Sequence, residues 1–196
     1  MTLEHVLTRA LLESCGHLSQ LHASGMVVDG RAVIALGGSD AGKSSLALAW
    51  TLSGYPSLGD DIVLLDGAGT ARPFPRHFKL DPEVLRACGL DPEHTPFWNP
   101  KTREVWFTPE GISGWAAPAP LGLVALCRRS VGVQLSISRL SRVEGVNALL
   151  HSLLDTGLDA RSSFQPIVDA LQRAEVIEVR FESSQDAARA IAGYPV

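Results

Sequence analysis

A glycine-rich loop in the first quarter of the chain carries the clearest chemical signal. Gly37, Gly42, Lys43 and Ser44 satisfy the spacing G-x-x-x-x-G-K-[ST] of a phosphate-binding loop. Its glycines let backbone N–H groups surround phosphate oxygens, and a helix after the loop points its positive end at the same anion. Lys43 would meet the β- and γ-phosphates, and the Ser44 hydroxyl would ligate Mg²⁺. The predicted nucleotide-binding residues are Gly37, Gly38, Ser39, Asp40, Ala41, Gly42, Lys43, Ser44 and Ser45.

Carboxylates on either side of a short apolar run could bind the metal ion and accept a proton in the reaction. Asp60 and Asp61 precede the run IVLL, and Asp66 follows it. Two adjacent carboxylates near Mg²⁺ could divide the work, one binding the metal and the other accepting the proton of an attacking hydroxyl. An apolar strand that ends in an aspartate, as at Asp66, is also typical of a magnesium ligand. The residue pattern leaves the pair and Asp66 as open alternatives.

Two arginines are candidates for stabilising the transferred group. Phosphoryl transfer requires positive charge over the equatorial oxygens of that group. Arg76 lies between Pro75 and His77, and Arg128 lies at the end of a predicted strand. Both are therefore candidate catalytic residues.

The elements that must position the loop form a mixed sheet. Apolar runs on both sides of Asp29-Gly30 predict a β-hairpin, whose second strand, 32–36, leads into the loop. The residues after the loop favour a helix that ends at Gly54. Because a hairpin is antiparallel, we expect a mixed rather than a purely parallel sheet.

The remaining pattern predicts one α/β domain with flanking helices. We divide the chain into a core at 17–66, an elaboration rich in Pro and Trp at 67–120, and C-terminal strands and helices at 121–196. The individual predictions are an amphipathic helix at 2–14, a helix capped by Asp81, a hairpin at 97–107, strands at 121–127, 131–138 and 176–181, a helix after a capping box of Ser141 and Glu144, a helix beginning near Pro166, and a C-terminal helix at 183–194.

Composition excludes several classes of function. The 196 residues carry a net charge of −4, with Lys and Arg scattered along the chain, so nucleic acid and anionic membranes are not expected partners. The three cysteines lie far apart, and no apolar run approaches the roughly 20 residues that span a bilayer. The N-terminal residues lack the profile of a signal peptide, and we therefore expect a cytoplasmic protein.

The stretch from Leu21 to Leu65 resembles the catalytic core of the HPr kinase/phosphorylase family, whose P-loop fold is shared with phosphoenolpyruvate carboxykinase. His22, Lys43 and the pair Asp60-Asp61 stand at the family's separations without a gap. The resemblance implies that Asp60 is the catalytic base and that His22 lies near the transferred phosphoryl group. It further implies that Asp61 holds the metal together with Ser44, and that the cofactors are ATP and Mg²⁺.

The chain also departs from that family. Its Glu-x-Arg-Gly-x-Gly signature is missing from 66–196. The stretches PFPRHFKLDPEVL and APAPLGLVALCRR instead resemble the wider set of HPr-kinase-like proteins, which includes kinases of peptide natural products and of free serine. We therefore expect neither phosphorylation of HPr nor the hexamer of that enzyme, while a homo-oligomer stays open.

These observations predict an ATP-dependent kinase. The expected acceptor is a hydroxyl, with a serine of a peptide or small protein as the leading hypothesis. A kinase of a free amino acid or another small molecule is the first alternative. A nucleotide-binding regulatory or assembly protein that transfers no phosphate is the second.

Overall fold

A long central strand, β10 (Ala119–Arg129), organises the fold. It pairs in parallel with β3 (Arg31–Leu36) on one side and with β12 (Glu175–Phe181) on the other. Parallel strands end at the same edge of a sheet, and Leu36 of β3 pairs with Leu126 of β10. The loop that follows β3 therefore begins beside the carboxyl end of β10.

The structure is a computed structural model that describes residues 3–95, 98–99, 101–102, 104–154 and 160–195. Its other strands are β1 (Ser19–His22), β2 (Ser24–Val28), β4 (Ser57–Gly59), β5 (Ile62–Leu65), β6 (Thr70–Pro73), β7 (Phe78–Leu80), β8 (Trp98–Asn99), β9 (Glu104–Phe107) and β11 (Ser136–Arg139). Its helices are α1 (Leu3–Ser14), α2 (Lys43–Leu52), α3 (Pro82–Ala87), the 3₁₀ helix η1 (Pro92–His94), α4 (Arg142–His151), α5 (Ala160–Leu171) and α6 (Ser184–Ala192).

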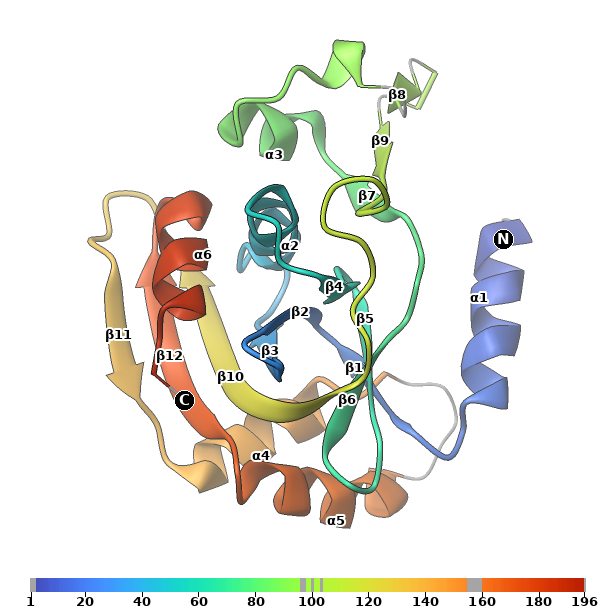
Figure 1. The fold of residues 1–196 in the computed structure, drawn as a ribbon, viewed down its shortest axis with the longest axis vertical. Coiled ribbons are helices and arrows are strands. Elements are labelled where there is room, and N and C mark those ends of the chain that lie inside the picture. Colours follow the sequence, from blue (N-terminus) through green and yellow to red (C-terminus); the bar gives the residue numbers. More distant parts are fainter. Residues whose placement is uncertain (1–2, 96–97, 100, 103, 155–159, 196) are drawn as a thin grey trace.

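The strands form a large mixed sheet and a small antiparallel one. In the large sheet the order is β1-β5-β6-β10-β3-β2-β4, and β12 and β11 continue it on the other side of β10. The small sheet has the order β7-β9-β8. Figure 1 shows this small sheet and α3 on the side of α2 that faces away from β10. The expected single α/β domain with a mixed sheet and flanking helices is thus confirmed.

Helices cover both faces of the sheet around β10. Side chains alternate along a strand, so Leu123 and Ala125 lie in a cluster with Trp50 of α2 and Ile191 of α6. Val124 points to the opposite face, in a cluster that includes side chains of α4 and α5. This three-layer packing buries β10 on both sides and fixes the edge where the loop begins.

The hairpin that leads into the phosphate loop is confirmed. Val28 pairs with Arg31, and Asp29 and Gly30 both have positive φ, at 49° and 75°. Positive φ at both central residues is the geometry of a two-residue turn that matches strand twist. The predicted caps at Asp81 and at Ser141 with Glu144 are also present.

Three predicted elements differ from the structure. The strand expected at 131–138 begins only at Ser136, because Gly132 turns the chain with a φ of 73° and leaves Val131 91% exposed. The helix expected to begin near Pro166 begins at Ala160 and contains Pro166, at the cost of one helical hydrogen bond. In the predicted hairpin at 97–107, Phe97, Pro100 and Arg103 lie outside the described residues, while β8 and β9 pair as expected.

The N-terminal helix α1 does not bury the apolar positions that predicted it. Leu3, Val6 and Leu11 are exposed, and Leu12 is the buried residue of the helix. Leu12 packs with Ile62 and Leu64 of β5. The helix is therefore amphipathic in sequence, but it contacts the domain through its other side.

In the part of the chain that the structure describes, none of the helices has the length and apolar character to cross a membrane.

The capping box at the start of α4 yields a stability prediction. The Ser141 hydroxyl accepts the Glu144 N–H, and the Glu144 carboxylate accepts the Ser141 N–H at 2.8 Å. Ser141→Ala removes the cap and is expected to lower the free energy of unfolding by about 1 kcal/mol. Urea unfolding measures this change, with Ser138→Ala on exposed β11 as the control. An effect no larger than that of the control would contradict the cap's contribution.

Candidate active site

The phosphate loop connects β3 to α2 and requires glycine for steric reasons. A Cβ at Gly37 would lie 2.6 Å from the Ala41 Cβ and 2.9 Å from the Cys127 carbonyl oxygen. Gly42 has a φ of 91°, and a Cβ there would lie 3.0 Å from the Phe181 ring. The loop thus wraps tightly over the ends of β10 and β12. Its backbone is held in place by the sheet edge.

Lys43 folds back over the first residues of this loop. Its Nζ donates hydrogen bonds to the carbonyl oxygens of Gly37 at 2.8 Å and of Gly38 at 3.1 Å. Burial lowers the pKa of the ammonium, while Asp61, Cys127, Asp60 and Asp40 raise it. The cation is therefore positioned over the loop, where phosphate oxygens are expected.

A tight turn places the two adjacent aspartates beside the loop. Gly59, at the end of β4, has a φ of 143°, and a Cβ there would lie 2.4 Å from the Ile62 carbonyl oxygen. The Ser24 hydroxyl donates to the Asp60 carbonyl oxygen at 2.6 Å and holds the turn against β2. Gly59 and Ser24 are supporting residues that the sequence analysis did not single out. In the sequence, the order Gly-Asp-Asp is the feature that could have indicated this turn.

Asp60 is a buried carboxylate whose pKa is raised to about 7. The residue is 8% exposed, and burial is the largest cause of the shift, followed by the charge of Asp61. Arg76 and a hydrogen bond from the Ser44 side chain act in the opposite direction. Among the described residues, its Oδ2 atom has no hydrogen-bond partner. A carboxylate with these properties can accept a proton near neutral pH.

Asp61 is held as an anion by the neighbouring elements. The Nδ1 atom of His22, on β1, lies 2.9 Å from Asp61 Oδ1, and the Arg76 Nη1 lies 3.2 Å from Asp61 Oδ2. The hydrogen bond with His22 is the largest cause that lowers the pKa of Asp61. Arg76 also contacts Glu4 of α1 at 3.5 Å. The structure therefore brings together His22, Asp61 and Arg76, which are far apart in the sequence.

Arg128 and Asp66 lie apart from this cluster. Arg128 lines a cavity beside the loop, but its Nε forms an ion pair with Glu178 at 2.7 Å. Asp66 accepts the Ala68 and Thr70 N–H groups and pairs with Arg72, so it shapes the turn between β5 and β6. The strand β5 separates Asp66 from Asp61, about 16 Å along an extended chain. This geometry favours the aspartate pair over Asp66.

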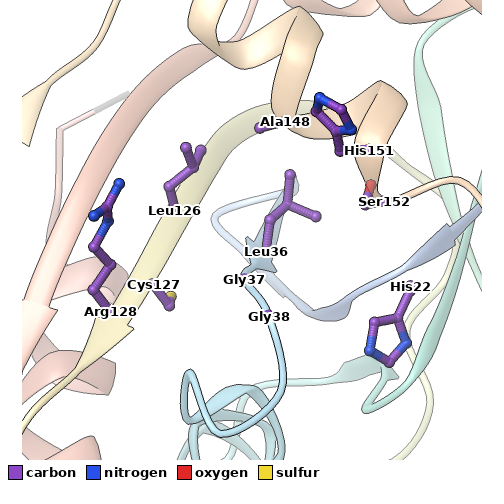
Figure 2. Close-up of a pocket in the computed structure, with 10 residues that line it drawn as sticks. All are labelled: His22, Leu36, Gly37, Gly38, Leu126, Cys127, Arg128, Ala148, His151 and Ser152. Carbon is purple, nitrogen blue, oxygen red and sulfur yellow. The ribbon is translucent and has the colours of Figure 1, made fainter.

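A cavity of about 500 Å³ opens where the loop meets His22. Its walls include Gly37 and Gly38 of the loop, Leu126 and Arg128 of β10, and His151 at the end of α4. Figure 2 shows His22 and Arg128 on opposite sides of this cavity, with His151 on the helix above. His151 is a wall residue that sequence reasoning missed, because only the fold brings α4 to the loop.

The residues present fit a magnesium ion that is shared with a nucleotide. No group of three or more His, Cys, Asp or Glu side chains that could hold a metal occurs within the described ranges. Mg²⁺ is usually held by one or two carboxylates together with substrate phosphates, so a purely protein cage is not required. The Ser44 hydroxyl and the carboxylate of Asp61, which is held as an anion next to Asp60, provide that partial set.

Comparison with known proteins shows a likeness of fold. No protein-family model matches the chain. None of the curated proteins matches it either. Among solved structures, an HPr(Ser) kinase/phosphatase from Coxiella burnetii is similar at 12% sequence identity, over 88% of this chain and 91% of that chain, with a TM-score of 0.44.

The raised pKa of Asp60 predicts a pH-dependent stability. Near pH 5, the folded carboxyl, with a pKa of about 7, binds a proton that the unfolded one, with the ordinary aspartate pKa of 3.8, has already lost. Stability from this group is therefore full at low pH and falls as the pH rises toward 7. Asp60→Asn cannot ionise, so its stability relative to the wild type should rise by about 2 to 3 kcal/mol from pH 5 to pH 8.

Urea unfolding at the two pH values, in chelator and without nucleotide, measures this difference. Asp66→Asn is the matched control, because the pKa of Asp66 is lowered and its titration lies below pH 5. A relative stability of Asp60→Asn that does not change between pH 5 and pH 8 would contradict the raised pKa.

Proposed function

We propose that this protein is an ATP-dependent kinase that transfers the γ-phosphoryl group to a hydroxyl. The observation that carries the proposal is the Asp60 carboxylate, which is buried beside the phosphate loop with one unpartnered oxygen and a pKa of about 7. A loop that only bound or switched a nucleotide would not need a proton acceptor at this place. The residue spacing shared with HPr-kinase-like proteins supports the same activity.

Each residue of the cluster has a role in the proposed reaction. The acceptor oxygen forms a bond to the γ-phosphorus as the bond from that phosphorus to the β,γ-bridging oxygen breaks, and ADP leaves. Asp60 takes the hydroxyl proton. Lys43 offsets the charge that develops on the phosphates, and Arg76 and His22 orient Asp61. Mg²⁺, held by Asp61 and Ser44, would neutralise charge on the β- and γ-phosphates when bound.

The cavity that contains His22 and His151 is the proposed acceptor site. It lies on the same side of the loop as Gly37 and Gly38, over which Lys43 is folded. A serine side chain of a peptide would enter it with its neighbouring residues outside. A volume of about 500 Å³ also falls in the usual range for small molecules, which supports a free amino acid as the second candidate acceptor.

The proposal is tested by separating binding from transfer. Asp60→Asn should keep Mg-ATP affinity within about threefold and lower phosphoryl transfer at least about 100-fold, because the proton acceptor is lost. Radiolabelled ATP with free L-serine and with a library of serine-containing peptides measures transfer, and calorimetry measures binding. Asp66→Asn, distant from the loop, should leave both quantities unchanged.

Other results of the same measurements would favour different roles for the two aspartates or a different function for the protein. Near-normal transfer by Asp60→Asn would contradict the base assignment. Loss of Mg-dependent binding in Asp60→Asn, with binding retained in Asp61→Asn, would exchange the roles of the two aspartates. Tight ATP binding by the wild type without any labelled acceptor would favour a regulatory protein and overturn the kinase proposal.

A further inference from the structure

A second cavity lies on the opposite flank of the phosphate loop. It has a volume of about 290 Å³, and one wall consists of the loop and the start of α2. The facing wall is formed by Lys79 of β7, Asp81 and Val84 at the start of α3, and Arg129 at the end of β10. Three of these residues belong to the segment rich in Pro and Trp. The functional roles proposed above use none of the four.

The position of Lys43 sets the direction in which a triphosphate lies on the loop. A lysine of this motif reaches the β- and γ-phosphates, and the Lys43 Nζ lies on the carbonyls of Gly37 and Gly38. The γ end therefore lies toward Gly37 and His22. The α end then lies beyond Ser44, toward Ser45 at the start of α2, which is the side where the second cavity opens.

The chemistry of the facing wall suits a nucleoside joined to phosphate. Arg129 lies against the loop, since a Cβ at Gly42 would be 3.4 Å from its Cδ. Its Nε donates to the Glu182 carbonyl oxygen at 3.3 Å, and its guanidinium provides this wall with a positive charge that suits an α-phosphate. Lys79 adds a second cation, paired with Glu104 at 2.8 Å. Val84 offers an apolar contact for the face of a base. The Asp81 carboxylate, whose Oδ1 accepts the Glu83 N–H, provides oxygen acceptors for ribose hydroxyls.

We propose that this second cavity binds the nucleoside of ATP, and that the small sheet and α3 are the part of the chain that recognises this nucleoside. The inference rests on the proposed function, because it assumes that a triphosphate occupies the loop. The adenine would lie against Val84, with the ribose toward Asp81 and the α-phosphate toward Arg129. The two cavities then divide the substrates, with the nucleoside on one flank and the acceptor hydroxyl on the other.

The first experiment compares Mg-ATP with Mg-tripolyphosphate by calorimetry. The wild type should bind ATP at least tenfold more tightly than tripolyphosphate. Val84→Trp fills the cavity with neutral bulk, so ATP affinity should fall at least tenfold while tripolyphosphate affinity stays within twofold. Val143→Trp, at a position on α4 that is 69% exposed, is the matched control and should change neither affinity. The unfolding midpoint without ligand checks that each variant is folded.

The second experiment uses the unmodified protein. Photolysis with 8-azido-ATP should label the tryptic peptide from Leu80 to Arg86, which contains Val84. Labelling confined to other peptides, such as the one that contains His151, would overturn the nucleoside site. Equal wild-type affinity for ATP and tripolyphosphate would also overturn it and leave the kinase proposal standing. Binding of neither ligand would instead overturn the proposed function, and the nucleoside site with it.

Discussion

The arrangement of the site depends on two adjacent carboxylates beside a loop of backbone N–H groups, of which Asp60 is buried and Asp61 is partly exposed. Two like charges at neighbouring positions cannot both stay ionised in a buried site without compensation. Here the compensation is divided unequally, since His22 and Arg76 both contact Asp61 and keep it anionic. Asp60 receives less, and its pKa rises to about 7. One turn thus produces two carboxylates with different chemistry.

The supporting residues are explained by this constraint. Gly59 is required because the turn approaches the Ile62 carbonyl too closely for a Cβ, and Ser24 fastens the turn to β2. The backbone N–H of His22 donates to the Ser152 carbonyl at 2.6 Å, which connects the end of α4 to the strand that holds the histidine. The Arg76 contact with Glu4 extends the same network to α1. The aspartate pair is therefore held in place by segments that lie far apart in the chain.

The phosphate loop is the boundary between two differently built regions. On one flank lie β1, which is a strand of the large mixed sheet, and the end of α4, which packs on that sheet. On the other flank lie β7 and α3, which have a small core of their own that includes Phe78 and Leu85. Ala47 and Leu48 of α2 belong to this small core, so the helix after the loop joins the two regions. The cavity on each flank thus has a wall that the loop itself does not provide.

Local sequence determined the features whose physics is local. The two-residue turn at Asp29-Gly30, the helix caps at Asp81 and Ser141, and the glycine spacing of the loop each depend on neighbouring residues, and the structure contains all of them. Where two local signals predicted different structures for the same residues, the sequence placed the ends of the elements less well. Gly132 shortened a strand that β-branched residues predicted, and Pro166 lies within a helix that it was expected to begin.

Tertiary structure decided the partners of the charged side chains. Arg76 and Arg128 were equal candidates in sequence, but only the fold shows that one contacts Asp61 while the other pairs with Glu178 on β12. Asp66 and the pair Asp60-Asp61 were likewise open alternatives in sequence, and only the fold shows that the strand β5 places them at its opposite ends. Burial, which raises the pKa of Asp60, depends on segments distant in the chain. Sequence therefore determined which groups the protein carries, and long-range packing decided which of them meet.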